Sequence, residues 1–353
     1  MISTRALYYP TIDIRDEEWL KTAFLFWDGI STIVPKSLEG RAYNNSTTQY
    51  LEGEGYLQPV IVNPDSEVVK RLVGRVKKYS DTDEGRACLN QPVPNDVQYN
   101  PYIDERSQFY LHHEKLPFEI QQLIADKLGD DGWARVSDNF ANYYMTLLAN
   151  AIASQKSMTL LTSAMPLAKL TTRCSEDAAK RLFTTPSGTG EKVNCQTMLV
   201  KMIIDGIKIN PLTSFDDLKL FKIHHADELD NFRNGLDEIS GLSLPEGIDY
   251  DGMVHVVKDI YDRKVLLPYK DLKAALSGSR INFIEDVGSL AFTGIATTYL
   301  EAFTALTTPL QLLVGTGIYM AVQGIKEYRN KRVIRRTSKM SYLLSVDREL
   351  RLR

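Results

Sequence analysis

The side chains best suited to acid–base chemistry stand together in the segment LHHEKL, residues 111–116. It contains His112, His113 and Lys115. Histidine titrates near neutral pH without any perturbation, and a lysine can hold an anion, so this segment can supply a general acid, a general base or an anion clamp. The structural alternative is that one histidine packs under a sheet edge while the other is solvated.

Two more polar side chains, Tyr9 and Asp13, stand at and just beyond the end of a short β-favouring run at residues 5–10. In open α/β sheets, ligands bind beyond the carboxyl ends of the strands. If this run and residues 108–111 are strands of one such sheet, the side chains that follow them share an edge. The sequence therefore predicts a ligand site made of Tyr9, Asp13, His112, His113 and Lys115.

A second histidine cluster, His224 and His225 with Glu228, falls in a charged segment with a helical pattern. Because His224 and Glu228 are four residues apart, one helix face would present both, and this spacing can chelate a metal ion. The nearby sequence offers no third ligand. An exposed, charged helix explains the cluster better, and we expect no metal site.

The segment TPSGTGEKV, residues 185–193, has only a superficial likeness to a phosphate loop. In that motif a lysine follows glycine directly and a hydroxyl residue follows the lysine. Here Glu191 precedes Lys192, and Val193 has no hydroxyl. The dinucleotide fingerprint, the G-x-S-x-G elbow and the kinase signature are also missing from the sequence. We therefore expect no cofactor and a linker at this segment.

The composition is that of an ordinary globular protein, with 353 residues, 43% hydrophobic and 25% charged. The formal net charge of -3 argues against binding to nucleic acid, which requires clustered lysine and arginine. The cysteines form no CxxC pair, and the N-terminus has no apolar run of signal-peptide length. We expect reduced thiols and a cytoplasmic location.

Strand and helix patterns alternate over the first half of the chain. Short β-favouring runs lie at residues 5–10, 30–34, 108–111 and 157–161. Helical patterns follow a cap at Asp13 or Asp16 and the turn at 63–66, and occupy 117–128 and 139–153, with a long loop at 80–106. This alternation predicts an α/β fold with a mostly parallel sheet and flanking helices in the N-terminal half.

After about residue 165 the alternation fades. Residues 196–204 form an ambiguous apolar run, and residues 214–239 have a charged, helical pattern. We predict an α/β domain at 1–183, a linker rich in Ser, Thr and Gly at 184–195, and a mainly helical region at 196–353.

The most unusual segment, residues 287–325, contains a single charge, Glu301, and is followed by a basic run. Its length and its basic flank meet the criteria for a membrane span, but polar residues dilute it and Pro309 divides it. The leading interpretation is an apolar helical hairpin in the core or in an oligomer interface. Reversible membrane contact and a true span are the alternatives.

Five segments carry a resemblance that spans most of the chain: LYYP, DEEWLKTAFLFWDGISTIVP, LHHEKL, YYMTLLANAIA and SYLLSVDREL. In this order they resemble a bacterial family of uncharacterised proteins, identified only as a domain of unknown function. Similar proteins often end the fourth strand in a Thr-Asp pair, whereas this chain has Thr162 and Ser163 there. The resemblance implies no activity, and it does not support a carboxylate acting at that strand end.

Three functions are consistent with the sequence. The leading one is a cytosolic binding or interaction protein that self-associates or docks a protein partner through its helical C-terminal region. The second is a hydrolase or transferase with a site at the carboxyl ends of the strands. The third is an effector that contacts a membrane through residues 287–325.

Overall fold

The structure, a computed structural model, describes residues 4–93, 110–163, 196–240, 250–277 and 338–350. The chain forms two compact units, residues 2–197 and residues 198–353. The division falls within helix α9 (Gln196–Asp205). The predicted linker at 184–195 and the apolar segment at 287–325 lie outside the described residues.

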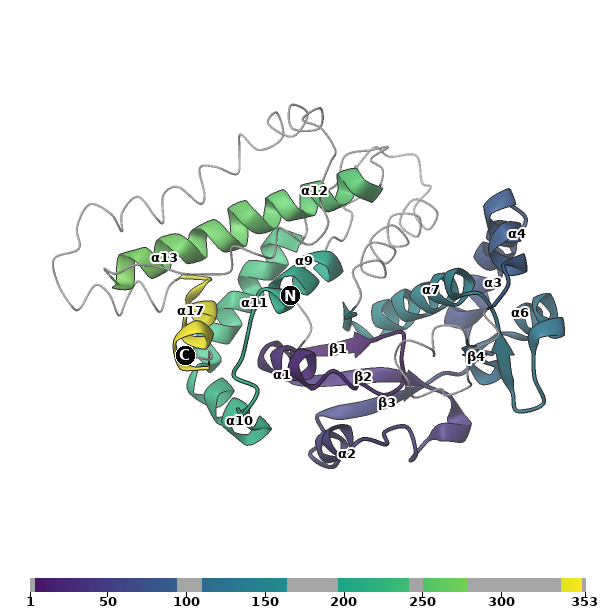
Figure 1. Ribbon diagram of the computed structural model, residues 1–353, viewed down its shortest axis with the longest axis horizontal. Helices are drawn as coiled ribbons and strands as arrows, with labels where there is room; N and C mark the ends of the chain where they lie inside the picture. The colour runs from purple at the N-terminus through teal and green to yellow at the C-terminus, as the bar shows by residue number, and fades with distance from the viewer. Residues whose placement is uncertain (1–3, 94–109, 164–195, 241–249, 278–337, 351–353) are drawn as a thin grey trace. The chain divides into compact units, whose positions relative to one another are not determined.

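The first unit is built on a four-stranded parallel sheet with the strand order β3-β2-β1-β6 (Figure 1). Its strands are β1 (Arg5–Tyr8), β2 (Gly29–Val34), β3 (Leu57–Ile61) and β6 (Thr159–Leu161). The chain passes outward from β1 to β3 and later returns to the other side of β1, so the order reverses between β1 and β6. Ligands of such sheets bind at the carboxyl edge, beside this reversal.

Helices cover both faces of the sheet. They include α1 (Glu17–Phe26), α2 (Ser46–Gly53), α3 (Glu67–Ser80), α6 (Phe118–Leu123) and α7 (Asp138–Lys156). Leu7 and Ile33 join the buried core cluster that contains the apolar residues of α3 and α7. Tyr8 points to the opposite face, where its ring lies 4.8 Å from that of Trp19 in α1.

Local capping explains where α1 begins. The Asp16 carboxylate accepts a hydrogen bond from the Trp19 N–H at 2.8 Å, which satisfies one of the free donors of the first turn. The prediction of a helix after Asp16 is confirmed.

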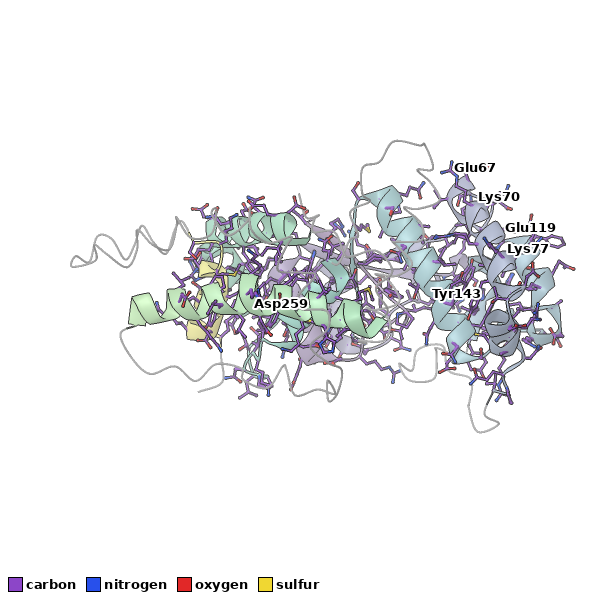
Figure 2. The ribbon with its side chains drawn as sticks, turned by 90° about the horizontal axis from the view of Figure 1, so that it is seen from above. Glu67, Lys70, Lys77, Glu119, Tyr143 and Asp259 are labelled. Atoms are coloured by element: carbon purple, nitrogen blue, oxygen red, sulfur yellow. The ribbon has the colours of Figure 1, made fainter. Side chains whose placement is uncertain are left out.

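Helices α3 and α7 pack against each other through Tyr79 and Tyr143, whose ring centroids are 4.1 Å apart. Figure 2 labels Tyr143 together with Glu67, Lys70 and Lys77 of α3. Both lysines are exposed, whereas Val69, Leu72 and Val76 are buried. Helix α3 is therefore amphipathic, as predicted for the segment after the turn at 63–66.

Strands β4 (Tyr110–His112) and β5 (Trp133–Arg135) form a separate antiparallel pair, in which Leu111 faces Ala134. The prediction that residues 108–111 belong to the parallel sheet is therefore wrong. A β-favouring run of four residues does not reveal which strand it will pair with, because that choice depends on contacts distant in the sequence.

Strand β3 and helix α4 are among the elements that the sequence analysis missed. Strand β3 contains Pro59, which cannot donate to a central ladder, but β3 is an edge strand and tolerates it. Helix α4 (Asp83–Asn90) interrupts the loop predicted at 80–106. The Thr82 hydroxyl caps α4 by accepting from the Gly85 N–H at 3.0 Å, so a local cap defines a helix too short to show clear periodicity.

The second unit is helical. After α9 it contains α10 (Phe215–His224), α11 (Ala226–Ser240), α12 (Tyr250–Tyr261), the π-helical turn η4 (Asp262–Leu266), α13 (Leu267–Ser277) and α17 (Ser341–Glu349). Helix α12, the π turn and α13 form one continuous rod (Figure 1). Helix α17 is mostly buried and contacts α11 and α13.

The predicted helix over 214–239 is two helices, because the backbone leaves helical geometry at His225. The predicted fold class is otherwise confirmed: a parallel α/β sheet with flanking helices precedes a helical region. Among the helices in the described ranges, none is both long and apolar enough to cross a membrane.

Candidate functional site

The LHHEKL segment ends β4 and then forms the 3₁₀ turn η2 (His113–Lys115). Its backbone is held from two sides. The His113 N–H donates to the Gly132 carbonyl at 2.8 Å, and the Gln121 amide donates to the Leu116 carbonyl at 2.9 Å. The turn is therefore rigidly supported.

Gly132 is required where it stands. Its φ is +82°, in the left-handed region that favours glycine, and a Cβ there would lie 2.7 Å from Cδ2 of His113. The absence of a side chain at Gly132 lets the backbone just before β5 pack against the imidazole of His113.

A long-range contact brings this turn to the carboxyl edge of the parallel sheet. The Glu114 carboxylate accepts from the Ser37 N–H at 2.8 Å and from the Ser37 hydroxyl at 2.9 Å. Ser37 lies in the 3₁₀ turn η1 (Lys36–Leu38), directly after β2. Although β4 is not a strand of the main sheet, its trailing residues reach the edge where ligands of such sheets bind.

The charge states of His112 and Glu114 follow from their surroundings. Burial, reinforced by His113, lowers the pKa of His112 to about 4, so its imidazole is neutral at neutral pH. Its Nδ1 accepts from the Glu114 N–H at 3.2 Å, which assigns the proton to Nε2. Burial alone would raise the pKa of Glu114, but the two hydrogen bonds from Ser37 outweigh it and lower that pKa, so Glu114 is ionised.

Lys115 is only 4% exposed, and burial lowers its pKa to about 7. Within the part of the chain that the structure describes, its amine makes no hydrogen bond or ion pair. Its carbonyl accepts from the Tyr144 hydroxyl at 2.5 Å, which anchors the residue to α7. Burial therefore favours the uncharged form of the Lys115 amine near neutral pH.

Asp13 has a different role. It is fully buried, and its carboxylate accepts from the Thr48 hydroxyl at 2.7 Å, the Asn45 amide at 3.0 Å and the Asn44 N–H at 3.2 Å. None of its hydrogen bonds goes to the histidines or to Lys115. Asp13 therefore braces the loop after β1 against the start of α2, with its oxygens occupied.

Tyr9 is also fully buried, in the core cluster that contains Leu111 and Leu116 on either side of the histidine segment. Tyr9 and the histidine segment therefore share one core, whereas the Asp13 carboxylate binds residues at the start of α2. At the reversal point itself, the Tyr8 hydroxyl and the Ser163 hydroxyl are 3.0 Å apart, which ties the ends of β1 and β6 together.

The loop after β1 is not built to hold a phosphate. Its residues Tyr9, Ile12 and Ile14 are buried and fill the space that a glycine-rich loop would leave open. The first turn of α1 carries Glu17 and Glu18, which oppose an anion at that helix end. Neither this loop nor the start of α1 therefore has the features of a nucleotide cradle.

Three supporting residues were missed by the sequence analysis: Ser37, Gln121 and Tyr144. Ser37 follows a predicted strand, so the rule that ligands bind beyond strand ends could have drawn attention to it. Gln121 and Tyr144 lie in predicted helices, and nothing in their local sequence distinguishes them from neighbours. Their roles come from tertiary contacts.

The second histidine cluster also differs from its prediction. His224 ends α10 and Glu228 lies in α11, so they do not share one helix. Instead His225 meets Glu228 at 3.3 Å and Glu349 of α17 at 3.1 Å. Across the ranges the structure describes, no group of three or more His, Cys, Asp or Glu side chains is arranged to hold a metal ion.

Comparisons with family models, curated proteins and solved structures find no match to this chain. Its function has to be argued from its own geometry.

Proposed function

We propose that the α/β unit acts on a small molecule at the carboxyl edge of its sheet, as a hydrolase or transferase in which Lys115 is the base. The observation that carries this proposal is the buried Lys115 amine, which makes no ion pair within the described residues and follows Glu114 and His112 in one rigid turn. The neutral His112 can donate from Nε2 to developing negative charge without adding a charge of its own.

Other buried lysines of the chain show what a structural role looks like. Lys21 is 6% exposed and binds Glu17 at 2.7 Å, and Lys201 is 7% exposed and binds Asp205 at 2.5 Å. A buried ammonium is costly unless it is paired, and these two are paired. Among the residues that the structure describes, no carboxylate pairs with the Lys115 amine, so its neutral form is favoured, as catalysis by a base requires.

Hydrolysis of p-nitrophenyl acetate, a generic ester substrate, tests the proposal. Lys115 would take a proton from water as the water oxygen attacks the carbonyl carbon, and p-nitrophenolate would leave with the electrons of the broken C–O bond. We expect the rate to rise through about pH 7 and to fall at least tenfold in Lys115→Met. Lys127→Met, which removes a surface lysine, is the matched control. If Lys115→Met keeps the wild-type rate and pH profile, this proposal fails.

A direct measurement of amine reactivity complements the rate. Reductive methylation with formaldehyde and cyanoborohydride requires the neutral amine, so Lys115 should be modified at pH 7 when probed by peptide mass spectrometry. Lys21 and Lys201 serve as buried controls, because carboxylates hold their amines. Equal protection of all three at pH 7 would contradict an accessible base.

A second candidate function, self-association through the helical region, has its own observation. Leu212, Leu220 and Ile223, in or just before α10, are 90%, 56% and 64% exposed. Leu220 and Ile223 are three residues apart in α10 and therefore lie on one helix face. Exposed apolar patches mark interaction sites, and we propose that a second copy of the chain covers this face. Light scattering should show a smaller particle for Leu220→Lys/Ile223→Lys than for the control Leu267→Lys. An unchanged mass would exclude this surface.

A further inference from the structure

Helix α3 concentrates positive charge on its solvent face. Its sequence contains five lysines and arginines and one carboxylate residue, Glu67. The whole chain has a formal net charge of -3 and α3 alone carries +4, so the rest of the chain carries -7. The positive charge of α3 is therefore local, and the net charge of the whole chain conceals it.

Four of these cations surround one residue, Gly74. Lys70 and Arg71 lie four and three residues before it, and Lys77 and Lys78 lie three and four residues after it. On a helix, these positions are the nearest surface neighbours of a residue. All four side chains are exposed, and within the described part of the chain none of them makes a hydrogen bond or an ion pair. Gly74 is therefore the centre of four unpaired cations.

Neither packing nor backbone geometry requires a glycine at position 74. The residue is exposed in the middle of α3, a Cβ there would have no atom within 4 Å, and its φ is not positive. Glycine in a helix interior is destabilising relative to alanine. Its effect here is to expose backbone between the pair of cations before it and the pair after it, which together span about 12 Å along the helix axis. The position leaves room for a ligand group to lie against the helix.

Two carboxylates belong to the surroundings of this face. Figure 2 labels Glu67, in the first turn of α3, and Glu119, in α6, a helix that contacts α3. Lys70 and Lys77 are labelled in the same view. Within the described residues, neither carboxylate forms an ion pair with them. The face therefore keeps its positive charge and attracts a ligand with several negative charges.

The size of the charged face decides what kind of anion fits it. An extended polyanion, such as nucleic acid or an anionic membrane, would reach beyond α3, where the net charge of the chain is negative. The four exposed side chains around Gly74 include no aromatic or apolar residue that would stack on a base or enter a bilayer. A compact ligand with several linked phosphates meets all four cations at once.

We infer that this face of α3 binds a free oligophosphate, a short chain of three or more linked phosphates, which lies over Gly74 between the two pairs of cations. Each phosphate carries at least one negative charge, and lysine and arginine hold phosphate oxygens by charge-assisted hydrogen bonds. The absence of a side chain at Gly74 lets the phosphates approach the helix closely. This site does not use Lys115 and is independent of the function proposed for the edge of the sheet.

Calorimetric titration of the full chain with sodium tripolyphosphate tests the inference. At about 0.05 M salt, where exposed charges are weakly screened, we expect saturable binding with a Kd of roughly 1 mM or lower, and about tenfold weaker binding of orthophosphate. Lys77→Gln/Lys78→Gln should weaken tripolyphosphate binding about tenfold, because two of the four cations are lost. Lys156→Gln/Lys208→Gln, which removes two exposed lysines outside α3, is the matched control and should bind as the wild type does.

A substitution at Gly74 should change binding and stability in opposite directions. Gly74→Ala should raise the midpoint of urea unfolding, because alanine favours the helix and its Cβ meets no atom. The same methyl group should weaken tripolyphosphate binding about threefold, because it holds the phosphates away from the backbone. Equal affinity of Gly74→Ala and the wild type would contradict the position of the ligand.

Competition experiments identify the source of the phosphates. ATP should bind no more tightly than tripolyphosphate, since no side chain around Gly74 holds a base. A short DNA duplex and phosphatidylserine vesicles, at the same concentration of phosphate groups, should not displace tripolyphosphate. The inference is overturned if tripolyphosphate does not bind saturably, if Lys77→Gln/Lys78→Gln binds it as tightly as the control does, if ATP binds more tightly, or if the duplex or the vesicles displace it.

Discussion

Two segments of similar composition, LHHEKL at 111–116 and IHHADEL at 223–229, use their histidines in different ways. In the first, His112 accepts a backbone hydrogen bond and is neutral, because burial lowers its pKa to about 4. The carboxylate next to it is held by Ser37 from a different part of the sheet edge. No carboxylate neutralises Lys115 within the described residues.

In the second segment, both nitrogens of the His225 ring face carboxylates, those of Glu228 and Glu349. Ser345 of α17 also donates to Glu228 at 2.5 Å. Here the ionisable groups pair with one another, and these contacts join α11 to α17. The composition of a histidine segment therefore does not determine its role. The role depends on whether oppositely charged side chains lie next to the ionisable groups.

The largest effect on stability is expected from removing Lys115, which has no carboxylate partner within the described residues. Lys115 has a pKa of about 7 in the folded protein and an ordinary value of 10.5 when unfolded. Between these values the unfolded chain binds more protons, so the wild-type free energy of unfolding rises with pH. Lys115→Met should be more stable than the wild type by up to about 5 kcal/mol at pH 6, and this gain should vanish by about pH 10.5.

Urea denaturation at pH 6, 8 and 10 measures this effect. Lys21→Met is the matched control, because it removes a buried lysine that has a carboxylate partner. We expect that control to lose stability. A gain in Lys115→Met that does not change with pH would mean that the Lys115 amine remains charged in the folded protein.

His112 should produce the next largest effect, at lower pH. Its pKa is about 4 when folded and 6.5 when unfolded, so the unfolded chain binds more protons between these values. Wild-type stability should therefore fall by about 3 kcal/mol as the pH drops from 6.5 to 4. His112→Gln should lack this part of the loss in the same denaturation series. An identical pH dependence in both proteins would contradict a neutral, buried His112.

Several parts of the fold could be predicted because they depend on neighbours in sequence. A cap at Asp13 or Asp16 predicted the helix that begins after Asp16, and the β-favouring run at 30–34 predicted β2. The pairing of β4 and the Ser37–Glu114 contact could not be predicted, since Ser37 and Glu114 are 77 residues apart. The candidate site was therefore only partly predictable.

Asp13 illustrates the limit. Its place after β1 suggested a ligand contact, and nothing nearby in sequence indicated that Asn44, Asn45 and Thr48 would occupy its oxygens. A buried carboxylate and a ligand-binding carboxylate are the same residue type at the same position in a strand–helix unit. Only the hydrogen-bond partners distinguish the two.

A smaller effect is expected from the histidine that fastens α17. His225→Ala removes the contacts with Glu228 and Glu349, and we expect a loss of about 1–2 kcal/mol in the stability of the helical unit. Hydrogen exchange should show faster exchange in α17, with β1 and β2 unchanged. His224→Ala, an exposed neighbour, is the control. If α17 exchanges at the wild-type rate in His225→Ala, the fastening role is wrong.

The smallest effect concerns the link between the LHHEKL segment and the sheet. Ser37→Ala removes the hydroxyl donor to Glu114 and keeps the backbone N–H donor. The pKa of Glu114 should rise because one of the hydrogen bonds that lower it is lost, while the free energy of unfolding falls by less than about 1 kcal/mol. A carboxyl-detected NMR titration measures the pKa. Ser66→Ala, at a helix start with no side-chain cap, is the control. An unchanged Glu114 pKa would mean that Ser37 does not hold the turn in solution. The site proposed at the carboxyl edge of the sheet would then lose its contact with the sheet.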